Sequence, residues 1–65
     1  MKKEKFIKHL RLYHCYPTGK QKGSHAHFKN EDSGKITIVP LHNDIDDFTT
    51  KRICKQLGIP LCGNN

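Results

Sequence analysis

The segment 22–28, Lys-Gly-Ser-His-Ala-His-Phe, holds the residues whose types and spacing could do chemistry. Gly23 can adopt a positive φ or let a ligand approach the backbone closely, and Ser24 offers a hydroxyl. His25 adds an imidazole, the side chain that most readily exchanges a proton near neutral pH. These three residues predict a reactive corner at a turn.

The residues after this corner alternate between polar and apolar types. In a strand over 25–29, His25, His27 and Lys29 would share one face, and the apolar residues between them would share the other. One face would then be available for chemistry and the opposite face for packing. We expect His25 to point away from the core.

The charge balance favours a polyanionic partner. Twelve Lys and Arg against six Asp and Glu give a net charge of +6, and nucleic acid is the commonest polyanion for a small basic domain. A basic surface kept only for solubility is the alternative. The basic residues near the corner and in the last predicted helix are Lys20, Lys22, Lys51, Arg52 and Lys55.

The length and the cysteines limit the class of protein. A chain of 65 residues buries only about 60% of its unfolded surface, so its core is small and an interior cofactor pocket is not expected. Cys15, Cys54 and Cys62 cannot all pair within one chain and form no Cys-x-x-Cys motif, which predicts reduced thiols. We find no signal-peptide core and no apolar run that could span a bilayer, so the expected compartment is the cytoplasm.

The first half of the chain predicts a helix and an edge strand. Phe6 and Leu10 lie on an apolar stripe of a basic helix over 3–13. A strand over 16–20 would contain Pro17, which cannot donate a hydrogen bond and therefore belongs at a sheet edge.

The residues 30–34 predict a hairpin loop, and the β-branched residues 35–39 predict the strongest strand. Pro40 ends this strand, which we expect at the centre of the sheet or beside it. Alternation places Ile36 and Ile38 on one face, which we assign to the core.

A second helix is predicted over 50–57, after an acidic stretch that suits a helix N-terminus. Thr49 is the expected N-cap, with Phe48 packing onto Ile53 as a hydrophobic staple. Gly58 is the expected stop.

The order helix, strand, strand, strand, helix predicts a single α+β domain over 1–65 with a mobile tail at 60–65. Two helices would cover one face of a three-stranded antiparallel sheet. This topology is that of a double-stranded-RNA-binding-domain-like fold.

The sequence also resembles the HicA toxins of type II toxin–antitoxin systems over about residues 3–59. The resemblance rests on the element order and on matching runs in the family's order and spacing. These runs are Gln21–His25, His27-Phe28, Val39-Pro40 and Lys51–Ile59. The first strand departs from the family, because the stretch 15–19 keeps only the aromatic residue of the usual pattern.

The resemblance implies a small mRNA interferase that a HicB-type antitoxin neutralises. The family's catalytic histidine, in Gly-Ser-His, falls on His25, and no cofactor or metal is expected. RNA carries its own nucleophile, the 2′-hydroxyl, so such an enzyme needs a base, and His25 could take that proton. His27 or a water could be the general acid. The candidate substrate contacts are Lys20, Lys22, Gly23, Ser24, His27, Lys51, Arg52 and Lys55.

Three alternatives remain open. His25 and His27 could bind zinc together with Cys54 or His42, although no closed ligand set with characteristic spacing is present. The chain could be a non-catalytic RNA-binding domain of the same fold. It could also be a protein-interaction domain without RNA affinity.

Overall fold

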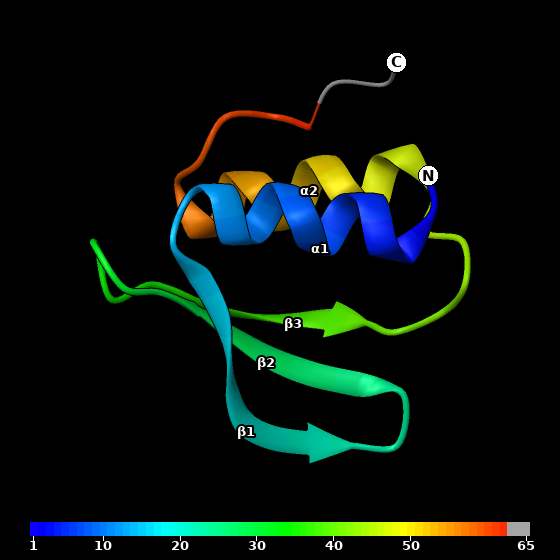
Figure 1. The fold of residues 1–65 in the computed structure, drawn as a ribbon, viewed down its shortest axis with the longest axis horizontal. Coiled ribbons are helices and arrows are strands. Elements are labelled where there is room, and N and C mark those ends of the chain that lie inside the picture. The colour runs from blue at the N-terminus through cyan, green and yellow to red at the C-terminus, as the bar shows by residue number, and fades with distance from the viewer. Residues whose placement is uncertain (63–65) are drawn as a thin grey trace.

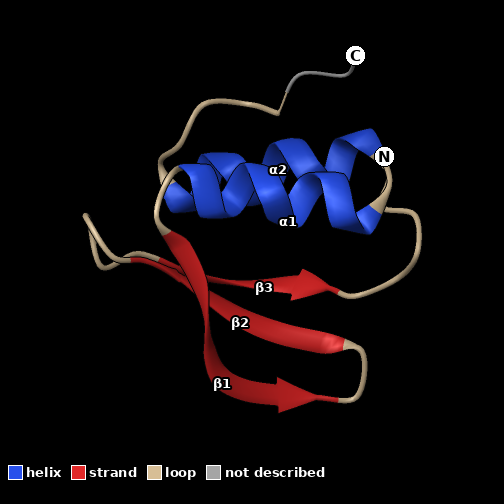
Figure 2. Cartoon of the chain, viewed as in Figure 1, coloured by secondary structure: helices blue, strands red, loops and turns tan. Residues whose placement is uncertain are grey.

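The computed structural model describes residues 1–62 and contains two helices and a three-stranded antiparallel sheet (Figure 1). The strands lie in the order β1, β2, β3, and both helices cover the same face of the sheet (Figure 2). This is the α-β-β-β-α fold that the sequence predicts. The elements are α1 (Lys3–Leu12), β1 (Cys15–Lys22), β2 (His25–Asn30), β3 (Ile36–Pro40) and α2 (Asp47–Leu57).

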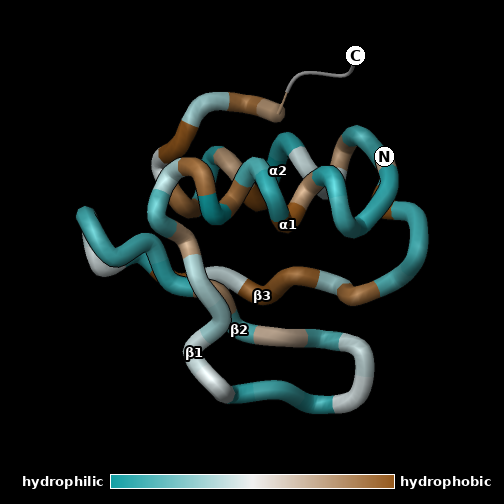
Figure 3. Tube along the Cα trace, viewed as in Figure 1, coloured by the Kyte–Doolittle hydropathy of each residue, from teal (hydrophilic) through white to brown (hydrophobic). Residues whose placement is uncertain are grey.

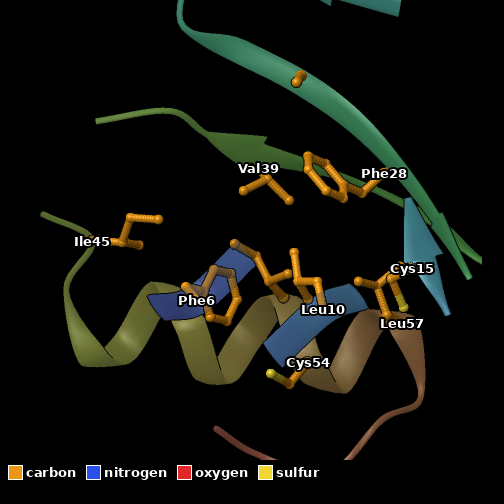
Figure 4. Packing of buried hydrophobic residues seen from close by; sticks show 10 residues of the cluster. Phe6, Leu10, Cys15, Phe28, Val39, Ile45, Cys54 and Leu57 are labelled. Carbon is orange, nitrogen blue, oxygen red and sulfur yellow. The ribbon is translucent and has the colours of Figure 1, made fainter. Parts of the chain in front are cut away.

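The core lies between the helices and the covered face of the sheet (Figure 4). Phe6 and Leu10 of α1 are fully buried, as the helical stripe predicts, and they pack with side chains from the sheet and from α2. The core also contains Cys15, Ala26, Phe28, Val39, Ile45, Ile53, Cys54 and Leu57. Because a core this small contains few large apolar side chains, each of them contributes substantially to the stability of the fold.

The face of β3 that packs on the helices is opposite to the one predicted. Ile36 is 55% exposed and Ile38 46% exposed, whereas Val39 is fully buried. The pairing register explains this, because cross-strand partners share a face and Val39 pairs with Ala26 while Ile38 pairs with His27. Since β3 is apolar along most of its length (Figure 3), hydropathy could not choose between its faces, and the prediction was wrong.

The start of α2 also differs from the prediction. The helix begins at Asp47 with Asp46 in the N-cap position, so the predicted Thr49 cap is wrong. Phe48 is 76% exposed and forms no staple, while Ile45, just before the cap, is buried in the core. Ile45 thus supplies the apolar anchor at the helix start, and Asp47 in the first turn interacts favourably with the helix dipole.

The end of α2 is fixed by Gly58 and by the buried Asn30 of β2. Gly58 has a φ of 70°, the left-handed conformation that glycine adopts readily at a helix end. Asn30 Nδ2 donates to the Leu57 carbonyl at 2.8 Å, while its Oδ1 accepts from the Asp32 amide at 2.9 Å. One side chain therefore joins the β2–β3 loop to the last turn of α2.

β1 is an edge strand, as Pro17 predicts. It pairs only with β2, and its register is interrupted between Pro17 and Gln21. Gly19 lies within this interruption with a φ of 95°. β1 is therefore a strand with an irregular centre, and its end at Lys22 pairs regularly with the start of β2.

All three cysteines are free thiols. Burial raises the pKa of Cys15 and of Cys54 above the ordinary thiol value, so these side chains stay protonated and serve as small apolar core residues.

The tail expected to be mobile, 60–65, falls partly on residues 63–65, which lie outside the described residues. Within the described part, His9 Nε2 lies 2.7 Å from the Pro60 carbonyl oxygen. No helix in residues 1–62 is long and apolar enough to cross a bilayer.

The two faces of β3 give a direct test of the packing. Val39→Thr should lower the free energy of unfolding by about 1–3 kcal/mol, because a hydroxyl replaces a methyl in the core. Ile38→Thr keeps the β-branched shape on the open face and should cost less than about 1 kcal/mol. Urea unfolding of both variants measures the difference, and a larger loss for Ile38→Thr would mean that the assigned register is wrong.

Candidate active site

The Gly23–Ser24 turn places His25 at the first position of β2. Lys22 and His25 pair directly across the hairpin, so the loop has two residues. Gly23 has a φ of 58°, which suits the first loop position of a type II′ turn. The turn thus fixes the backbone of His25 at the end of the hairpin.

His25 points away from the core, as the alternation predicts. Ala26 is 4% exposed and Phe28 2% exposed on the helix-covered face, while His25 is exposed and His27 half-buried on the other. The imidazole of His25 is therefore accessible to a ligand from solvent.

A second histidine, His42, lies beside His25. The ring centroids are 6.1 Å apart, and the two planes meet at 72°. His42 follows the end of β3, and two contacts hold its segment to the turn: the Leu41 amide donates to the Ser24 carbonyl at 2.6 Å, and Ser24 Oγ lies 3.3 Å from His42 Nε2. The hydroxyl of Ser24 is thus engaged by an imidazole.

The segment that carries His42 is also held by the start of the chain. Met1 and Ile45 exchange two hydrogen bonds, with N···O distances of 2.9 and 2.8 Å. The Lys3 amide donates to the Asn43 carbonyl at 3.0 Å. These long-range bonds flank His42 on its C-terminal side and limit where its backbone can lie.

Both histidines line an open hollow of about 1010 Å³ that extends along the edge of β3 to α2. On the far side, Arg52 Nη1 donates to Gln56 Oε1 at 3.4 Å, and the Thr37 hydroxyl donates to the same oxygen. A guanidinium, a planar donor well suited to phosphate, therefore shares this hollow with the imidazoles. The polar residues of its lining are His25, His27, Thr37, His42, Asp46, Thr49, Arg52 and Gln56.

The structure brings some predicted site residues together and separates others. Lys22, Gly23 and Ser24 line a smaller hollow of about 520 Å³ that shares His25 and His27 with the first. Arg52 reaches the larger hollow from α2. Lys22, Gly23 and Ser24 are thus next to His25 at the turn, while Arg52 borders the same large hollow from α2.

The remaining predicted lysines lie elsewhere. Lys51 and Lys55 line another groove, together with Phe48 and Leu61, and Arg52 borders both this groove and the hollow of the histidines. Lys20 is exposed on β1, within the stretch where pairing with β2 is interrupted.

The zinc ligand set considered from the sequence is not assembled. Cys54 of α2 is fully buried in the core (Figure 4), whereas His25 is exposed on the opposite face of the sheet. Residues 1–62 contain no group of three or more His, Cys, Asp or Glu side chains placed to hold a metal ion.

His42 is the site residue whose place the sequence analysis missed, since it was considered only as a zinc ligand. No local motif marks it. A signal was nevertheless present in the strand pairing: β3 is antiparallel to β2 and ends at Pro40, which pairs with His25. The residues just after Pro40 must therefore emerge near the start of β2.

Comparison with known proteins identifies the family to which the chain belongs. A family model described as "HicA toxin of bacterial toxin-antitoxin" matches residues 4–59. No significant match was found to a curated protein or to a solved structure. Because the match spans both helices, all three strands and the Gly-Ser-His corner, the chain belongs to the HicA family of toxins from bacterial toxin–antitoxin systems.

Proposed function

We propose that this toxin is an endoribonuclease that cleaves mRNA and thereby inhibits translation, with His25 as the general base. The observation that carries the proposal is the exposed imidazole of His25 in a hollow that the imidazoles of His27 and His42 and the Arg52 guanidinium also line. Membership of a toxin family supports a reaction harmful to the cell, and the +6 charge supports a polyanionic substrate.

The chemistry suits a site built from side chains. The 2′-hydroxyl of RNA lies next to the phosphate that it can attack, so the nucleophile comes with the substrate. An imidazole that removes the proton of this hydroxyl during the attack typically contributes about 10²–10⁴-fold to the rate. His25 is accessible for this role, and its backbone is fixed by the turn and by pairing with β3.

Several positive or polar groups surround the place where the scissile phosphate would lie. Lys22 is the cross-strand partner of His25, and Arg52 approaches from α2. These cations, together with the backbone amides of Gly23 and Ser24, would stabilise charge that develops on the phosphate. His27 lines the same hollow and would contact the substrate next to His25. Lys20, Lys51 and Lys55 would bind phosphates farther along the RNA.

The His25→Ala variant tests the catalytic assignment. His25 is exposed, so its removal opens no cavity and the melting temperature should stay close to that of the unchanged protein. RNA affinity should be largely retained, while cleavage should fall by about 10²–10⁴-fold. His9→Ala removes a half-buried histidine of α1 and its contact with the Pro60 carbonyl, outside the hollow. It is the control for losing a histidine elsewhere and should cleave normally.

Melting, RNA affinity and cleavage must be measured on the same preparations. Full cleavage by a folded His25→Ala protein would contradict the assignment. RNA binding without cleavage by the unchanged protein would instead favour the non-catalytic RNA-binding domain.

Charge-neutralising variants on α2 test the path of the RNA. Arg52→Gln should weaken RNA binding and reduce the slope of log affinity against log salt by about 1, because one phosphate contact is lost. Lys51→Gln removes the same charge from the preceding residue, which lies outside the hollow of the histidines, and should have a smaller effect. Equal effects of the two variants would show that binding depends on overall charge and not on this hollow.

A toxin of a toxin–antitoxin system has an antitoxin as its partner, and we propose a HicB-type protein that covers the hollow around His25. Covering the hollow would exclude the substrate, and an acidic partner surface would complement the basic residues around it. RNA and antitoxin should therefore compete. Titrating the antitoxin into a complex with fluorescent RNA should release the RNA, and a stable ternary complex would contradict this arrangement.

A further inference from the structure

We propose that His42 is the general acid of the cleavage reaction, which gives a proton to the 5′-oxygen that leaves. This assignment rests on the proposed function, in which His25 is the general base. It follows from the position of His42 beside Ser24 and His25, which are adjacent in the sequence and distant from His42.

The two imidazoles are placed to flank one phosphate. In an in-line displacement the attacking and leaving oxygens lie on opposite sides of phosphorus. Each catalytic nitrogen must come within about 2.6–3.2 Å of its own oxygen, so a nitrogen of each ring must reach the same phosphate. The ring centroids of His25 and His42 are 6.1 Å apart in an edge-to-face arrangement, and both rings line one open hollow, so a phosphate bound in the hollow against the edges of both rings would meet a nitrogen of each.

His42 fits the role of the acid better than His27. His27 lies two residues from His25 on the same strand and the same face, so the two side chains project in parallel and reach a phosphate from one side. His42 comes from the segment after β3, and its ring meets that of His25 at 72°. His25 and His42 therefore enter the hollow from different elements and at different angles, which suits two groups that must reach different oxygens of one phosphate.

Ser24 holds the ring of His42 in place. The distance between Ser24 Oγ and His42 Nε2 is 3.3 Å, and in the protonated imidazole Nε2–H must be the donor. Because Ser24 then engages Nε2, we assign the proton transfer to Nδ1. The hydrogen bond from the Leu41 amide to the Ser24 carbonyl, at 2.6 Å, fixes the adjacent backbone. Ser24 is thus a positioning residue for the acid.

The step balances without a further reactant. The 2′-oxygen forms a bond to phosphorus while its proton moves to neutral His25. The bond between phosphorus and the 5′-oxygen breaks, and protonated His42 gives its Nδ1 proton to that oxygen. The products are a 2′,3′-cyclic phosphate and a 5′-hydroxyl, and exchange with water restores both histidines.

A substrate with a different leaving group distinguishes a general acid from a residue that only maintains the structure of the site. The cleaved linkage is first mapped with the unchanged protein, and a second RNA is made with sulfur in place of the bridging 5′-oxygen at that linkage. A thiolate leaves without a proton. His42→Ala should therefore cleave the oxygen substrate about 10²–10⁴-fold more slowly and the sulfur substrate at nearly the unchanged rate.

His25→Ala and His27→Ala are the matched controls. His25→Ala should be impaired on both substrates, because the base is needed with either leaving group, and His27→Ala should show no rescue by sulfur. His42→Gln keeps a donor for Ser24 but cannot transfer a proton, and it replaces His42→Ala if melting shows that the latter does not fold.

Three results would overturn the assignment of His42 and leave the proposed function standing. His42 variants equally slow on both substrates would make His42 structural, and rescue of His27→Ala by sulfur would transfer the role to His27. Normal cleavage of both substrates by His42 variants would remove His42 from the chemistry while His25 stays the base. Normal cleavage by His25→Ala can be distinguished from these three results, because it would overturn both the proposed function and the assignment of His42.

Discussion

The packing of Ala26 and Phe28 against the helices is the constraint on which the site depends. Alternation along β2 then sends His25 and His27 to the opposite face. Since both helices lie on one side of the sheet, that opposite face has no cover within the described structure. A core large enough to fold this short chain therefore leaves one whole sheet face available for a ligand.

The same constraint explains which parts of the fold could be predicted. Helical stripes such as Phe6 and Leu10 bury one side only, and the glycine turn before His25 leaves one register for the hairpin. β3 was harder, because both of its faces carry β-branched residues and its buried face was decided by pairing with Ala26. The start of α2 was misplaced since Ile45 took the anchoring position expected of Phe48.

The residues of the candidate site that are contiguous in the sequence could be predicted, and those that only the tertiary structure brings together could not. The corner at His25 is contiguous in sequence, so residue types and spacing were sufficient to find it. His42 joins it through tertiary contacts: the antiparallel pairing of β2 with β3, and the hydrogen bonds that hold the following segment to Ser24 and to the start of the chain. In the same way, the sequence could not distinguish Arg52 from Lys51, because neighbouring residues on a helix point in different directions. Packing decides that Arg52 borders both the hollow of the histidines and the groove next to it, whereas Lys51 borders only that groove.

The bonds between Met1 and Ile45 have a consequence for the order of folding. The β1–β2 hairpin that carries His25 needs only local closure, and hairpins form within about 1–10 μs. Met1 and Ile45 are separated by 44 positions, and closing so long a segment costs more chain entropy than a turn does. We therefore expect the loop of His42 to become fixed late, when the two halves of the chain meet. During synthesis on the ribosome, the polypeptide would carry His25 long before it could form the complete histidine pair.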